Sequence, residues 1–164
     1  MLEGRLGLLS VVVSQQQMIQ RASTALVDDV VDVTVPADGG WLGILRTATA
    51  GMAARLGFPG DKIEDLRIAV DEACAMLLVL TQPNGDLHCR FEISVEVLTV
   101  AISARIRPGS RLPDPSSFGW RVLSGLTSQA WTEQEGDMAT IRLACERPVS
   151  NQDTSSAKDA IGGR

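Results

Sequence analysis

The strongest constraint on the fold of this chain is a long alternation of apolar and polar residues that begins at Leu87. Successive side chains of a β-strand point to opposite faces. The alternation from Leu87 to Val97 therefore predicts a strand with one buried and one solvated face. The same period returns from Val100 to Ile106, so we expect a hairpin. The apolar positions of the first strand are Leu87, Cys89, Phe91, Ile93, Val95 and Val97.

Two segments ahead of this hairpin have the spacing of amphipathic helices. Asp38 can cap the first, which runs to about Leu56, and Asp61 can cap the second, whose apolar stripe continues to Leu80. Alternating valines from about Val30 predict a strand before the first helix. The later elements predicted by the pattern are an irregular loop over 107–117, a helix over 119–131 and a closing strand over 141–145.

The order of these elements predicts the fold class. Helices do not separate the strands one by one, which disfavours a doubly wound parallel sheet. We expect an α+β fold: a two-layer sandwich with a mixed, mostly antiparallel sheet and helices on one face. The length of 164 residues suits one domain. Residues 1–29 are expected to form a flexible or partly docked N-terminal extension, residues 30–148 the domain, and residues 149–164 a disordered tail.

Composition excludes several classes of function. The net charge is −5, which disfavours binding to the phosphate backbone of a nucleic acid. No stretch reaches the roughly 20 apolar residues of a membrane span. Three scattered cysteines fit reduced thiols packed in the core of a cytoplasmic protein. A zinc site is not expected, because His88 beside Cys89 is not a recognised ligand spacing.

The second helix carries the motif that links this chain to a known family. Its residues from Glu64 to Met76 read EDLRIAVDEACAM. This run resembles the helix of the anti-sigma factor serine/threonine kinases, which have the GHKL, or Bergerat-type, ATPase fold. There a Glu-Ala-x-Thr-Asn run supplies a catalytic base and an Mg²⁺ ligand, four residues apart on one helical face. Glu72 stands at the position of the base.

The resemblance continues from about Asp32 to Leu143. Arg46 lies where the family has an arginine that contacts protein partners. By the same resemblance Gly109, Gly119 and Thr140 stand at nucleotide-binding positions. The family implies ATP and Mg²⁺ as cofactors. Its partners are an RNA polymerase sigma factor and an anti-sigma factor antagonist. It also implies a homodimer, and a bacterial role in transcription regulation and the stress response.

Two positions depart from the family pattern. Met76 stands in place of the Mg²⁺-binding asparagine, and a thioether is a poor ligand for that hard cation. Arg107 stands in place of the aspartate that accepts from the adenine amino group, and arginine only donates. A shift of register across 107–119 would make Asp114 the acidic candidate. We therefore expect an eroded nucleotide site and a weak or inactive kinase.

Alternatives remain at each candidate residue. Glu72 is either a catalytic base or a solvated carboxylate, and Met76 fills space where a cofactor would lie. Arg107 and Arg111 either bind phosphate, or are exposed charges or contacts to an acidic partner. Arg46 is a partner contact or a surface residue. The chain as a whole reads as an anti-sigma factor, as an active kinase of the antagonist, or as a module with another ligand in a more apolar pocket.

Overall fold

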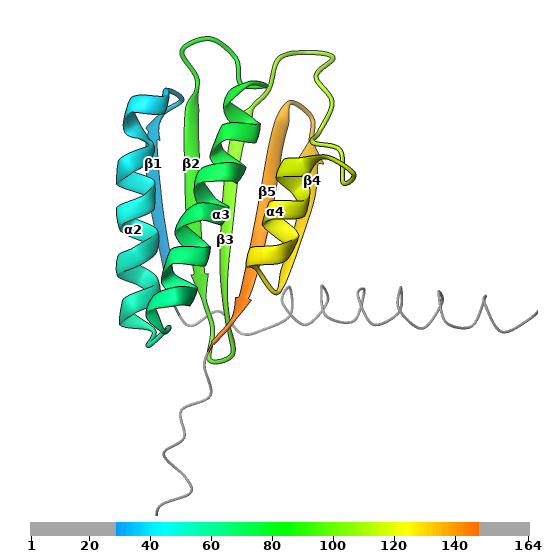
Figure 1. Cartoon of the computed structure of the whole chain (residues 1–164). Coiled ribbons are helices and arrows are strands. Elements are labelled where there is room, and N and C mark those ends of the chain that lie inside the picture. The colour runs from blue at the N-terminus through cyan, green and yellow to red at the C-terminus, as the bar shows by residue number, and fades with distance from the viewer. Residues whose placement is uncertain (1–28, 148–164) are drawn as a thin grey trace, which may run out of the picture.

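The computed structural model describes residues 29–147, which form one antiparallel sheet with helices on one face (Figure 1). The expected N-terminal extension and C-terminal tail lie outside these residues. The strand order is β1-β2-β3-β5-β4, and every pairing between these strands is antiparallel. The strands are β1 (Asp29–Pro36), β2 (Asp86–Ile93), β3 (Val97–Arg105), β4 (Gln129–Glu135) and β5 (Met138–Glu146).

The helical layer consists of α2 (Leu42–Arg55), α3 (Gly60–Leu78) and α4 (Phe118–Leu126), preceded by a short 3-10 turn η1 (Gly39–Trp41). The carboxylate of Asp38 accepts from the backbone N–H of Gly40, so it caps η1 rather than α2. The N-cap of α3 is Pro59, and Asp61 lies inside the first turn, where a negative charge favours the helix. The expected cap at Asp61 was thus misplaced by two residues.

The hairpin and the C-terminal helix differ from the expected bounds. β2 ends at Ile93 and the chain turns between Ser94 and Val97, where each backbone N–H bonds back to the other residue. Val95 is therefore an exposed turn residue and not part of a strand. The helix expected over 119–131 ends at Leu126, and its last residues belong to β4. Thr127 ends the helix by turning to extended backbone.

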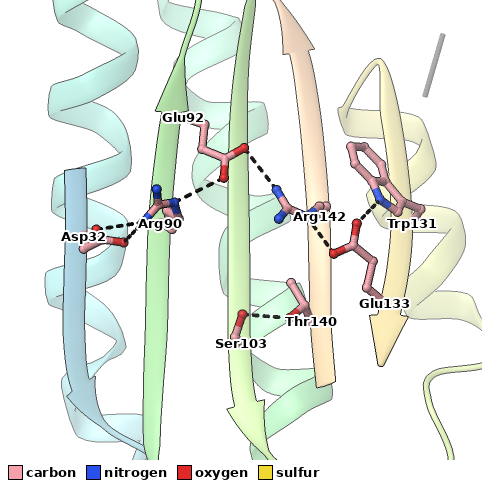
Figure 2. A network of polar contacts seen from close by, with 8 residues as sticks. All are labelled: Asp32, Arg90, Glu92, Ser103, Trp131, Glu133, Thr140 and Arg142. Atoms are coloured by element: carbon pink, nitrogen blue, oxygen red, sulfur yellow. Dashed lines mark hydrogen bonds and ion pairs between the residues drawn. The ribbon is translucent and has the colours of Figure 1, made fainter. Parts of the chain in front are cut away.

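The core lies between the helices and the sheet face that carries the apolar half of each alternation. Phe91 of β2 and Leu143 of β5 are fully buried there against Leu66 and Leu77 of α3. Burial of side chains of this size contributes roughly 1.5–3 kcal/mol each. The three cysteines are buried as expected, and burial raises the pKa of the Cys74 thiol to about 12. The opposite face of the sheet carries the polar half of the alternation (Figure 2).

Candidate functional site

The candidate site centres on Glu72 in the middle of α3. Glu72 and Met76 lie one helical turn apart and both face the beginning of α4. A Cβ atom at Gly119 would lie 2.3 Å from the Glu72 Oε1 and 3.4 Å from the Met76 sulfur. Only glycine therefore fits at 119 with Glu72 as it stands. The structure brings Glu72, Met76 and Gly119 together, with α4 packed directly on α3 at this point.

These residues do not provide a site that fits Mg²⁺. The side chain beside Glu72 is a thioether, whereas Mg²⁺ takes oxygen ligands in near-octahedral geometry. Among residues 29–147 there is no group of three His, Cys, Asp or Glu side chains placed to hold a metal ion. The donor set around Glu72 thus differs from the carboxylate-plus-amide pair that the family resemblance implies.

Arg107 forms hydrogen bonds with backbone carbonyls at the end of α3. Its guanidinium donates to the backbone carbonyl oxygens of Val79 and Thr81, and its backbone N–H donates to the carbonyl of Leu80 at 2.9 Å. Val79 is the C-cap of α3, so its carbonyl lacks a partner within the helix and a cation is favoured beside it. Arg107 is therefore neither a wholly free surface charge nor an acceptor for adenine.

The loop from 107 to 117 is built from local turns. Gly109 has φ +79° at the third position of a turn that Ser110 closes by donating to the Arg107 carbonyl at 3.0 Å. Pro at the second position and Gly at the third are the residues that a type II turn requires. The Asp114 carboxylate accepts from the Ser116 N–H at 2.7 Å, which lowers the pKa of Asp114. Gly109 and Asp114 thus serve the loop itself.

Thr140 lies on the other side of the sheet from Glu72. Its neighbours Ala139 and Ile141 point into the core, so Thr140 points to the face without the described helices, where its hydroxyl bonds that of Ser103 at 2.8 Å (Figure 2). The structure does not bring Thr140 together with Glu72 and Gly119.

A ladder of ion pairs crosses the same face, and we did not anticipate it from the sequence. Arg90 pairs with Asp32 and Glu92 at 3.1 and 3.2 Å, and Arg142 pairs with Glu92 and Glu133 at 3.1 and 3.0 Å (Figure 2). The ladder links β1, β2, β5 and β4. It crosses β3 above Ala101, whose small side chain lies between Arg90 and Arg142 in the register.

The ladder shifts the pKa values of Glu133 and Arg142. Partial burial alone would raise the pKa of Glu133, but hydrogen bonds from the Trp131 indole and from Arg142 bring it below its ordinary value. Partial burial would lower the pKa of Arg142, and its bond to Glu133 together with the charge of Glu92 raises it instead. Arg142, with 24% of its side chain exposed, is held on both sides by carboxylates.

Arg46 on α2 pairs with Asp71 on α3. The Arg46 Nη1 lies 3.2 Å from the Asp71 Oδ1, with 42% and 39% of the two side chains exposed. Two large apolar residues nearby in the chain are also exposed: Trp41 at the end of η1, by 47%, and Ile44 in α2, by 46%. Arg46 is thus oriented by α3 and still accessible at its edge.

Comparison with known proteins supports the family resemblance. The serine-protein kinase RsbW of Bacillus subtilis (strain 168) is 36% identical over 78 residues, which cover 46% of this chain and 49% of that protein. The serine-protein kinase RsbW of Halalkalibacterium halodurans is 46% identical over 46 residues, or 28% of each chain. The chain spans about half the length, or less, of the curated relatives it matches. No family model matches it.

A solved structure has the same fold. The crystal structure of the RsbU and RsbW domains of Rv1364c from Mycobacterium tuberculosis matches 74% of this chain and 34% of that chain, with a TM-score of 0.58 and 15% identity. The expected α+β fold is confirmed, and the resemblance to the anti-sigma factor serine kinases is confirmed by the named relatives. No helix between residues 29 and 147 is long and apolar enough to cross a membrane.

Proposed function

We propose that this chain, a relative of the RsbW serine-protein kinases, is an anti-sigma factor that works by binding and has an eroded nucleotide site. It sequesters an RNA polymerase sigma factor in the cytoplasm and releases it when an antagonist protein captures the anti-sigma factor. The observation that carries the proposal is the pair of replaced groups. Met76 beside Glu72 is no Mg²⁺ ligand, and Arg107 is engaged with carbonyls at the end of α3.

The energetic argument follows from those two groups. Phosphoryl transfer depends mainly on positioning and on metal ions that neutralise the developing charge. Without a metal ligand at 76 and an acceptor at 107, the two groups that would position ATP are missing together. Loss of one preorganised electrostatic contact costs about 2.7–4 kcal/mol in a transition state. Glu72 alone does not replace them.

The direct test is calorimetric titration of the full chain with ATP, with and without Mg²⁺. We expect no heat of binding up to millimolar ATP. The variant Met76→Asn with Arg107→Asp restores both family residues, and Met76→Leu with Arg111→Asp is the matched control. Gain of Mg²⁺-dependent binding in the first variant alone supports the eroded site. Micromolar Mg²⁺-dependent binding by the unmodified chain contradicts it.

The second candidate function is an active serine/threonine kinase that phosphorylates the antagonist. It is favoured by Glu72, which remains at the position of the catalytic base. The experiment is incubation of the chain and a candidate antagonist with ATP and Mg²⁺, read by mass spectrometry. Phosphate on an antagonist serine or threonine, lost in Glu72→Gln, would establish the kinase and overturn the binding-only proposal.

We also propose a homodimer that pairs along the sheet. The support is the polar face with the ion-pair ladder and the half-buried Trp131, which the described helices leave uncovered. Sedimentation equilibrium of the full chain is the measurement. A monomer at all concentrations up to roughly 100 µM, which corresponds to a dimerisation free energy weaker than about −5.5 kcal/mol, would contradict this pairing.

A further inference from the structure

A groove of about 330 Å³ opens between the beginning of α3 and the end of α4. It does not include Glu72. Phe58, Leu66 and Leu126 form its apolar walls, and Cys145 of β5 also lines it. Lys62 and Glu146 lie at its polar side. Thr127 and Ser128 line the groove as well. It therefore combines an apolar wall with a polar side that carries one charge of each sign.

Gly125 leaves the groove open on the side of α4. At its beginning α4 packs on α3 through Gly119. Near its end Gly125 also lines the groove, and a Cβ atom there would meet nothing within 4 Å. Glycine weakens a helix interior, so this residue does not serve the stability of α4. It leaves space for side chains that α4 itself does not supply.

The register of the sheet places the N-terminal segment near this groove. Asp29 pairs with Ile93, Ile93 with Leu98, and Leu98 with Cys145, so these four residues form one row across the sheet. Three strand spacings separate Asp29 from Cys145, or about 14 Å. The chain ahead of Asp29 thus enters the sheet on the row that ends at the groove.

The segment ahead of Asp29 contains a dense apolar run. Residues 6–13 read LGLLSVVV, and no charged residue interrupts them. Large aliphatic side chains are costly to leave in water. The 15 residues between Val13 and Asp29 span about 22 Å even as a helix, and more when extended, so the run reaches across 14 Å.

We propose that residues 6–13 dock in the groove between α3 and α4 of their own chain. The occupant is then an aliphatic segment, which suits the walls formed by Phe58, Leu66 and Leu126. Docking there covers the thiol of Cys145 and ties the N-terminus to the end of the helical layer far from Gly119.

Cys145 provides a reporter for this contact. The experiment measures the alkylation rate of each cysteine by iodoacetamide in the folded full-length chain, by mass spectrometry. The test variant is Leu8→Asp with Val12→Asp, and the matched control is Gln15→Asp with Gln16→Asp just after the run. We expect at least a tenfold faster reaction of Cys145 in the test variant and no change in the control. Cys74 and Cys89 do not line the groove and should stay unreactive.

Equal Cys145 rates in all three proteins would overturn the proposal. If all three cysteines accelerate together, the variant has unfolded, and a cross-link decides. Val12→p-benzoylphenylalanine in the full chain is irradiated at low micromolar concentration. A link to residues 58–66 or 125–128 of the same chain supports the docking. A link only between two chains identifies a second copy as the occupant, and no link to either segment also overturns the proposal.

Discussion

The backbone of Gly119 lies directly against the carboxylate of Glu72, so close that a Cβ atom at 119 would stand 2.3 Å from the Glu72 Oε1. This contact joins the residue that the family resemblance assigns as a base to the glycine that begins α4. It makes the position of α4 depend on the rotamer of Glu72. The dependence is measurable as an energetic coupling between the two residues.

Gly119→Ala should destabilise the chain by about 1 kcal/mol, because Glu72 must leave its rotamer. In the background Glu72→Ala the same change should be neutral or stabilising by up to about 1 kcal/mol, since alanine favours helix over glycine. The measurement is urea unfolding of the four proteins of the cycle. Gly51→Ala on α2, where a Cβ meets nothing within 4 Å, is the control. Equal effects in both backgrounds would show that 119 and 72 are not coupled.

Arg107→Ala should lower the free energy of unfolding by about 1 kcal/mol, the typical value of a lost hydrogen-bonding cap. The change leaves the carbonyls of Val79 and Thr81 without their guanidinium donor. Arg111→Ala in the same loop should stay within about 0.5 kcal/mol. Guanidinium chloride unfolding compares them. If the two variants are equally stable, Arg107 is not a cap in solution.

Glu133→Gln should flatten the dependence of stability on acid pH. The folded pKa of Glu133 is depressed, so its contribution is present above its unfolded pKa and is lost as pH falls through the lower folded value. Half of this side chain is exposed, so we expect only a few tenths of a kcal/mol. Urea unfolding at pH 7 and pH 3.5 gives the difference. Glu135→Gln, at the end of the same strand, is the control, and an equal flattening there would contradict the assignment.

Arg46→Ala should weaken binding of the antagonist or sigma factor at least tenfold, if Arg46 contacts partners as the family resemblance implies. The lost pair with Asp71 is half exposed and should cost less than about 1 kcal/mol of stability. Fluorescence anisotropy with a labelled partner measures the binding. Arg55→Ala in the last turn of α2 is the matched control. Unchanged affinity in Arg46→Ala would remove Arg46 from the interface.

Local patterns predicted most of the fold, because most strands and helices have one solvated face; the central strand β3 is the exception, with residues 98–102 buried on both faces. The alternation at Leu87 to Ile93 and the stripe of α3 required no tertiary information. β4 was missed because Ala130 and Trp131 continue the helical spacing of Val122, Leu123 and Leu126. The hairpin was misplaced because Val95 keeps the period although it lies in the turn.

The site was less predictable from sequence. Glu72 and Gly119 could be named from a motif, but their contact depends on how α4 packs on α3. The cap formed by Arg107 and the ladder around Arg142 are long-range contacts between residues far apart in the chain. Alternating polar residues in β2 and β5 predict a solvated face, but they do not predict which charged side chains form ion pairs across β3.

The two ends of the loop from Arg107 to Ser117 are fastened to one helix. Arg107 donates to backbone carbonyls just after the end of α3, and Gly119 packs against Glu72 in the middle of α3. These two contacts are about 10 Å apart along the axis of α3. A loop whose two ends are both held by the same helix cannot swing open as a flap hinged at one end does. Its middle is held as well, because Leu112 packs against the core. Movement of the loop therefore requires Leu112 to leave the core or α4 to separate from α3. A ligand that binds between this loop and α3 would therefore have to deform the loop or displace α4.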